Sequence, residues 1–183
     1  MPHVTMPQGL PPGTPGLMMY RPETGRPISQ LVEVLMRGPS SLSRSDREMM
    51  AAYVSQLNDC AFCVNTHSEI SAQQSPDGRA LVDKVLADVK SAPLSPKLRA
   101  LMNIAEAVVV SGKNVTPELV EAARKEGADD TDIHDAVLTS AAFCMFNRYC
   151  DGMDAVVPED PQAYVGMAAM LIREGYSTCA DGH

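Results

Sequence analysis

The chain has 183 residues, of which 45% are hydrophobic and 21% are charged, and this length and composition predict one domain with a substantial core. A net charge of -8 argues against nucleic acid or an anionic membrane surface as a partner, because either would repel the protein. No apolar run approaches the ~20 residues of a membrane-spanning helix, and the first residues lack the basic-then-apolar pattern of a signal peptide. The five cysteines lack the framework spacing of a small secreted protein, so we expect a reducing, cytoplasmic location.

Residues 1–27 contain seven of the 14 prolines together with four glycines. Because proline and glycine disfavour helices and central strands, this segment is predicted to be an extended arm. We expect it to be either loose or laid over a neighbouring subunit.

From Ile28 to about residue 175, apolar residues recur at helical spacing, and no segment alternates convincingly between apolar and polar residues. The sequence therefore predicts an all-α domain over residues 28–175, followed by a tail at 176–183. Ser43, with Asp46 three residues later, is a predicted helix N-cap. The pairs Ser95-Pro96, Thr116-Pro117 and Asp160-Pro161 are predicted to start three further helices.

The composition also predicts self-association. Aromatic residues make up only 4% of the chain and tryptophan is absent, so small aliphatic side chains and the 12 methionines must fill the core. A proline-rich arm cannot bury itself, and a helical subunit of this kind gains from covering its apolar faces symmetrically. We therefore expect a homo-oligomer.

The candidate site lies in the segment from Cys60 to His67. Two cysteines three residues apart on a helix face the same way and can close a reversible disulfide, and His67, four residues after Cys63, lies on that face too. Cys60 follows the predicted break at Asn58-Asp59, so it lies at a helix start, where a thiolate is favoured. We expect at least one thiol of this pair to have a pKa below its ordinary value.

Glu48, on the preceding predicted helix, has two interpretations. It could orient His67 as part of a proton relay, or it could close a capping box that begins at Ser45. The spacing supports both equally, although a cap formed by Ser43 and Asp46 would leave Glu48 free.

A structural zinc site is a weaker interpretation of the cysteine pair, because such a site needs four ligands. Cys144, Cys150 and His134 do not form a second pair, since they are spread around one predicted helix. We interpret Cys144 as a core residue and His134 as a surface residue. The sequence assigns no role to Cys150 or Cys179, and the default interpretation of each is a structural or surface thiol.

Glu48, eleven intervening residues, and then Cys60-x-x-Cys63-x-x-x-His67 resemble the signature of the alkylhydroperoxidase D-like branch of the carboxymuconolactone decarboxylase family. Asn58 and the run from Phe146 to Gly152 resemble the peroxidase-related members of that family. The resemblance covers roughly residues 28–175. It implies an AhpD-like helical bundle that assembles into homo-trimers or homo-hexamers, with thiol peroxidase or disulfide reductase chemistry and neither metal nor haem.

The sequence departs from the family pattern at Phe62. In the best-known alkylhydroperoxidases the residue before the second cysteine is a histidine of the proton relay, whereas the aromatic ring of Phe62 cannot carry a proton. This replacement weakens the expectation of efficient peroxide turnover and leaves the dithiol chemistry in place.

The sequence thus predicts a cofactor-free antioxidant oxidoreductase that reduces organic hydroperoxides and is reset by a dithiol donor. Cys63 is the predicted attacking thiol, Cys60 the resolving thiol, His67 the base and Glu48 its orienting partner, although Cys60 could also attack first. One alternative is a dithiol–disulfide reductase or electron-transfer adaptor that rarely meets peroxide. A second alternative is a non-enzymatic oligomeric protein that binds an apolar ligand.

Overall fold

A computed structural model of the protein describes residues 2–177 and 179–180, and these residues form helices and connecting segments without a β-strand. The elements are α1 (Gly13–Tyr20), α2 (Pro22–Arg37), α3 (Arg44–Leu57), α4 (Ala61–Gln74), α5 (Gly78–Ala87), α6 (Pro96–Val110), the 3₁₀ helix η1 (Gly112–Asn114), α7 (Pro117–Lys125), α8 (Asp130–Gly152) and α9 (Pro161–Glu174). The all-α prediction is confirmed. None of the helices in this described part combines the length and the apolar character that crossing a bilayer requires.

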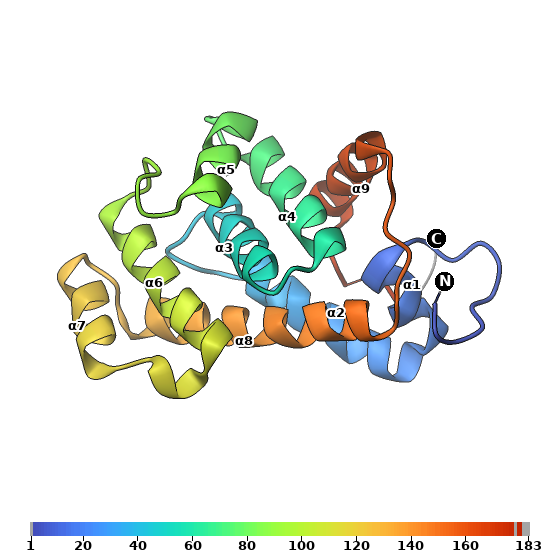
Figure 1. Ribbon diagram of the computed structural model, residues 1–183, viewed down its shortest axis with the longest axis horizontal. Coiled ribbons are helices and arrows are strands. Elements are labelled where there is room, and N and C mark those ends of the chain that lie inside the picture. Colours follow the sequence, from blue (N-terminus) through green and yellow to red (C-terminus); the bar gives the residue numbers. More distant parts are fainter. Residues whose placement is uncertain (1, 178, 181–183) are drawn as a thin grey trace.

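The helices α3 and α4 form the centre of the molecule (Figure 1). They make the most extensive helix–helix contact in the described chain. The long helix α8 packs against α3 and α6, while α9 packs against α4. Figure 1 shows α6 and α7 at one end of the molecule and α1 and α9 at the other. Helices from both ends of the sequence therefore lie close to the N-terminal end of α4.

The predicted helix starts are confirmed. Ser43 caps α3 by accepting a hydrogen bond from the Asp46 backbone N–H at 3.1 Å. Three other helices begin with a capping oxygen followed by proline at the first helical position. The capping residues are Ser95, Thr116 and Asp160.

The prediction of an extended arm at residues 1–27 is wrong, because α1 and the first turns of α2 lie within it. Pro15 lies in the first turn of α1 and Pro22 is the first residue of α2, where a backbone N–H would have no helical partner in any case. Helix α1 packs against α2 and α8 of its own chain. Proline content therefore did not prevent helix formation in this segment.

The predicted tail at residues 176–183 also differs from the structure at its beginning. Gly175, with φ of 85°, ends α9 and turns the chain back toward the core. Tyr176 is buried, and its backbone N–H donates to Glu33 Oε2 at 2.6 Å. Residues 178 and 181–183 of the predicted tail lie outside the described residues.

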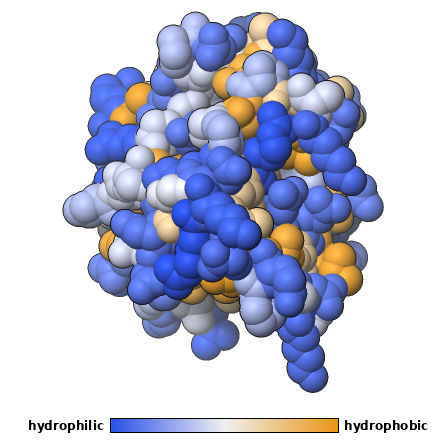
Figure 2. Space-filling view, turned by 90° about the vertical axis from the view of Figure 1, so that its left-hand side faces the viewer, coloured by the Kyte–Doolittle hydropathy of each residue, from blue (hydrophilic) through white to orange (hydrophobic). Residues whose placement is uncertain are grey.

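The core is built from aliphatic and methionine side chains, as the composition predicted. Its largest fully buried apolar members are Phe143, Leu17, Met36, Met49, Met50, Ile70, Leu101, Met102, Ile104, Val54 and Val82. At the α6–α7 end of the molecule, Figure 2 shows a mainly hydrophilic surface with apolar side chains in small separate areas.

A buried ion pair fixes the start of α8. Asp132 accepts hydrogen bonds from Lys97 Nζ at 3.0 Å, from the Ser41 hydroxyl and from the Asp129 backbone N–H. Burial alone would raise the pKa of the Asp132 carboxyl, but the bonds from Ser41 and Lys97 outweigh it and the pKa is lowered. A lowered pKa stabilises the folded state above the ordinary value, and this contribution is lost as the pH falls through the folded-state pKa.

We therefore predict that Asp132→Asn lowers the free energy of unfolding by ~2 kcal/mol at pH 7, because hydrogen bonds to a charged group are lost. The difference from wild type should shrink as the pH falls below 3.8, the ordinary value for this carboxyl. Urea denaturation across this pH range measures it. Asp130→Asn is the control, since the Asp130 side chain is 83% exposed and its replacement should change stability by less than ~0.5 kcal/mol. A pH-independent loss in Asp132→Asn would contradict the prediction.

Candidate active site

The two cysteines of the predicted pair lie at the N-terminal end of α4. Cys60 is the N-cap residue and Cys63 lies in the first turn. Asp59 adopts a left-handed conformation with φ of 58°, and this sharp turn lets α4 begin immediately after α3 ends. The side chains are deeply buried, with Cys60 0% and Cys63 3% exposed. Both are free thiols.

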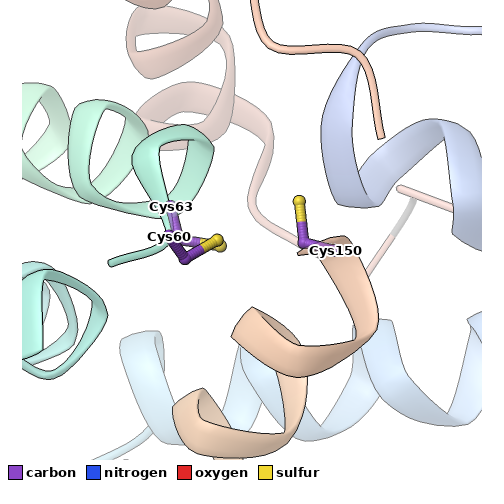
Figure 3. Close-up of side chains that lie close together, drawn as sticks. All are labelled: Cys60, Cys63 and Cys150. Atoms are coloured by element: carbon purple, nitrogen blue, oxygen red, sulfur yellow. The ribbon is translucent and has the colours of Figure 1, made fainter. Parts of the chain in front are cut away.

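A third cysteine joins this pair. Cys150 lies near the C-terminal end of α8 and is 1% exposed. The sulfur atoms of Cys60, Cys63 and Cys150 all lie within 4.8 Å of one another. Figure 3 shows the two α4 cysteines pointing toward Cys150 across the gap between α4 and α8. Cys150 is therefore not a surface thiol, and it lies beside the predicted cysteine pair.

A polar network holds α8 in the position that brings Cys150 to the pair. Asn58, at the end of α3, donates from Nδ2 to Asn147 Oδ1 at 3.0 Å. Asn147 in turn donates to the Ser55 hydroxyl at 3.0 Å, and both residues are fully buried. Because buried amides need such partners, this network fixes the register of α8 against α3. Asn147 lies three residues before Cys150, so the cysteine is placed one turn further along the same face.

The three thiols share hydrogen bonds, which determine their acidities. The pKa of Cys150 is lowered, because the Cys60 and Cys63 thiols and the Thr14 hydroxyl donate hydrogen bonds to its sulfur. The pKa of Cys60 is raised, first because its thiol donates to Cys150 and also because it is buried. The pKa of Cys63 is raised well above its ordinary value by donation to Cys150 and Cys60, and by burial. The cluster therefore loses one proton readily and holds the others firmly.

This distribution corrects the expectation that Cys60 or Cys63 has the lowered pKa. The start of α4 alone would favour a thiolate, but a neighbouring sulfur that accepts two thiol hydrogens is a stronger local influence. The negative charge is placed on α8 instead of on α4.

Glu48 and His67 are brought together as the relay interpretation predicted. His67 Nδ1 lies 2.6 Å from Glu48 Oε2, and both residues are buried. The other carboxylate oxygen, Oε1, accepts a hydrogen bond from the Tyr176 hydroxyl at 2.7 Å. The capping-box alternative for Glu48 does not hold, because Ser43 caps α3 and the Glu48 carboxylate bonds to His67 and Tyr176.

The His67 ring and Cys63 line one pocket. Its remaining lining residues come from α1, α2, α4, α8, α9 and the segment after α9, and they are mainly apolar: Thr14, Pro15, Met18, Ser29, Val32, Phe62, Thr66, Phe143, Phe146, Met167, Leu171, Tyr176 and Cys179. The edge of Phe143 packs on the His67 ring with centroids 4.6 Å apart. The pocket is thus an apolar chamber with a thiol and an imidazole on its wall.

Phe62, which stands where the family pattern has a second histidine, is a packing residue. It is 3% exposed and its ring lies 6.1 Å from that of Tyr164. Gly13, with φ of 67°, lies so close to the Phe62 ring that a Cβ there would be 2.1 Å from the ring atom Cζ. The aromatic ring therefore supports the start of α1, which covers the site.

His134, Cys144 and Cys179 lie outside the cysteine cluster. The His134 side chain is 70% exposed and lies beside Asp135, which confirms its predicted surface position. Cys144 is partly buried, packs against the core and accepts a hydrogen bond from Asn58 Nδ2 at 3.4 Å. Cys179 lines the pocket, and burial raises the pKa of its thiol to about 11.

Sequence reasoning missed Cys150 and Tyr176 as members of the site. The proximity of Cys150 depends on how α8 packs, and nothing in the local spacing reveals it. One signal was available, since the run from Phe146 to Gly152, which contains Cys150, resembles the peroxidase-related members of the family. Tyr176 follows the helix-ending Gly175 and carried no pattern of its own.

Comparisons with known proteins agree with this fold. Residues 22–75 match the model of the carboxymuconolactone decarboxylase family. Among curated proteins, the uncharacterized protein YdfG of Bacillus subtilis is 29% identical over 110 residues, which cover 60% of this chain and 74% of YdfG.

Two solved structures share the fold. An uncharacterized peroxidase-related protein from Silicibacter sp. TM1040 aligns with a TM-score of 0.79 and 24% identity, covering 90% of this chain and 93% of its own. An uncharacterized peroxidase-related protein from Ralstonia eutropha JMP134, described as an alkylhydroperoxidase AhpD core, aligns with a TM-score of 0.71 and 25% identity, covering 81% and 76%. The resemblance found in the sequence is thereby confirmed: residues 22–75 match the carboxymuconolactone decarboxylase family, and the described chain shares the fold of these AhpD-like, peroxidase-related structures.

Proposed function

We propose that the protein is a thiol-dependent peroxidase that reduces organic hydroperoxides through Cys60 and Cys63. The observation that carries this proposal is the contact between His67 and Glu48, at 2.6 Å, beside a pocket whose wall includes both His67 and the Cys63 thiol. A buried carboxylate bonded to Nδ1 fixes the imidazole tautomer and leaves the other ring nitrogen free to accept a proton.

In the first step His67 removes the proton of Cys63. This thiol needs a base, because hydrogen bonding and burial raise its pKa. The resulting thiolate attacks one peroxide oxygen, the O–O bond breaks, and the alkoxide leaves as an alcohol with the proton held by His67. Cys63 is then a sulfenic acid.

In the second step the Cys60 sulfur attacks the sulfenic sulfur, forming the Cys60–Cys63 disulfide and releasing water. One hydroperoxide and two thiols have then become one alcohol, one water and one disulfide. A dithiol donor in a reducing, cytoplasmic compartment restores the thiols by exchange. No cofactor takes part in this cycle.

The burial of the pair supports a peroxide substrate over the alternative of a disulfide reductase. Cys60 is 0% and Cys63 is 3% exposed, so a small hydroperoxide can reach the pocket more easily than a disulfide on another folded protein can. Phe62 is the observation that favours the alternative, because it removes one possible proton carrier. Comparing the rate of cumene hydroperoxide consumption with the rate of reduction of a protein disulfide distinguishes the two.

The thiol chemistry predicts a specific pattern of masses. After one equivalent of organic hydroperoxide, intact-mass spectrometry of the wild type should show the loss of two hydrogens, with peptide mapping placing the disulfide at Cys60 and Cys63. Cys60→Ser combined with Cys150→Ser removes both neighbouring thiols, and Cys63 should then accumulate a sulfenic acid that a dimedone probe captures. Cys144→Ser is the matched control and should behave as wild type. An unreactive pair would leave only the non-enzymatic binding alternative, and a sulfenic acid found only at Cys60, in Cys63→Ser combined with Cys150→Ser, would reverse the order of the two cysteines.

The relay predicts that Glu48→Gln lowers peroxide turnover by ~10²-fold or more, because the amide no longer stabilises a protonated His67. Glu69→Gln, on α4, is the control, since Glu69 pairs with Arg79 away from the pocket wall. Turnover and melting temperature are measured on the same samples. If Glu48→Gln loses only stability and its folded fraction keeps wild-type turnover, Glu48 is structural and the relay is wrong.

We also propose that the protein is a homo-oligomer, either a trimer or a hexamer. Several large apolar side chains are exposed in the single chain, including Val34 at 66% and Val156 at 55%. Such surfaces favour association with a second copy. Light scattering over a micromolar dilution series should return a mass three or six times the 19.6 kDa of one chain. A constant mass near that of one chain would contradict this proposal.

A further inference from the structure

The peroxidase cycle uses two sulfurs, whereas the structure brings three together. The sulfurs of Cys60, Cys63 and Cys150 lie within 4.8 Å of one another, and all three residues are buried. We propose that these three cysteines form a binding site for a thiophilic d¹⁰ cation, with Zn²⁺ or Cd²⁺ bound by three thiolates. This inference concerns the same thiols as the proposed peroxidase function but does not depend on that function.

The geometry is close to that of a metal–thiolate site. With Zn–S bonds of about 2.3 Å, two ligands of a tetrahedral site lie roughly 3.8 Å apart, so the cluster needs to contract by no more than about 1 Å. Cys60 and Cys63 provide the Cys-x-x-Cys spacing from one helix start, and Cys150 provides the third sulfur from α8, as Figure 3 shows. Ligands from two separate helices are typical of a site that a fold holds ready.

The surroundings of the sulfurs suit thiolates. Cys60 is the N-cap residue of α4 and Cys63 lies in its first turn, where unpaired N–H groups favour negative charge.

The donor set determines the class of cation. Three thiolates select soft or borderline metals such as Zn²⁺, Cd²⁺ and Cu⁺, and they disfavour Mg²⁺ and Ca²⁺, which prefer oxygen ligands. Three protein ligands leave the fourth tetrahedral position for water or a small molecule. Because Cys63 also lines the apolar pocket, the pocket is the path by which such a molecule would reach the cation.

Metal binding and oxidation exclude each other at this site. A disulfide between Cys60 and Cys63 removes two of the three ligands, and a bound cation removes the free thiolates that peroxide would attack. The same cluster would thus hold either a cation or a disulfide. Occupancy by the cation protects the thiols from oxidation.

The experiment uses the full chain, reduced, freed of metal with a chelator and kept without oxygen. Titration with Cd²⁺ should give a sulfur-to-metal charge-transfer band that saturates at one equivalent per chain. Competition by Zn²⁺ against a chromophoric chelator then gives the zinc affinity. We expect Cys150→Ala and Cys150→Ser to weaken that affinity by ~100-fold or more, since a lost direct ligand weakens binding at least as much as a lost outer partner. The control, Cys144→Ala on the same helix, should bind as wild type.

Three results would overturn the proposal: no charge-transfer band in the wild type, saturation at other than one equivalent, or unchanged affinity in both Cys150 variants. Circular dichroism and melting temperature establish that each variant is folded, and the pair of variants separates loss of the sulfur from loss of packing. Disulfide formation by hydroperoxide in metal-free Cys150→Ser tests the peroxidase function separately. If Cys150→Ser still forms the disulfide but no longer binds the cation, both the peroxidase function and the metal site are supported. If Cys150→Ser forms no disulfide while the wild type binds the cation, only the peroxidase function is contradicted.

Discussion

The architecture of the site depends on one buried carboxylate. Glu48 is 2% exposed, and a carboxyl group in such a place is tolerated only when both of its oxygens are hydrogen-bonded. One oxygen bonds to His67 of α4 and the other to Tyr176, just after α9, while Glu48 itself belongs to α3. Three segments that are distant in sequence are therefore tied to a single carboxyl group. This constraint orients the His67 ring toward the pocket and also explains why the chain after Gly175 turns inward to the core.

The N-terminal helix gives the same site its enclosure. Gly13 lies against the Phe62 ring, and its backbone N–H donates to the Val156 carbonyl at 2.9 Å, so α1 is held to the segment that follows α8. Thr14, Pro15 and Met18 then form part of the pocket wall. A histidine in place of Phe62 would add a proton carrier, but it would also present a polar ring to a closely packed glycine. In this chain Phe62 packs against α1, and His67 with Glu48 is the pair proposed to transfer the proton.

Local chemistry explains which features the sequence predicted. Helix caps such as Ser43 with Asp46, and the spacing of Cys60, Cys63 and His67, are short-range properties that one helix turn determines. Two features lay beyond such reasoning. Residues 13–20 and 22–27 are helical although they contain three prolines. Pro15 and Pro22 occupy first-turn positions, which composition alone does not distinguish from helix-breaking ones, and α2 continues through Pro27. Cys150 reaches the cysteine pair because Asn58, Asn147 and Ser55 set the register of α8, and that register is a tertiary property.

Placing three thiols together in a dry interior has a chemical consequence beyond packing. A single buried cysteine is inert, but three neighbouring sulfurs can lose protons in two productive ways: two of them can join as a disulfide, or all three can bind a cation. Both outcomes replace thiol hydrogens that the interior can only partly satisfy with stronger bonds. The first outcome requires an oxidant small enough to enter the chamber under α1, and the second requires a thiophilic cation. Because Cys150 is needed for the second and not for the first, this residue separates a plain redox pair from a cluster whose reactivity a metal can block.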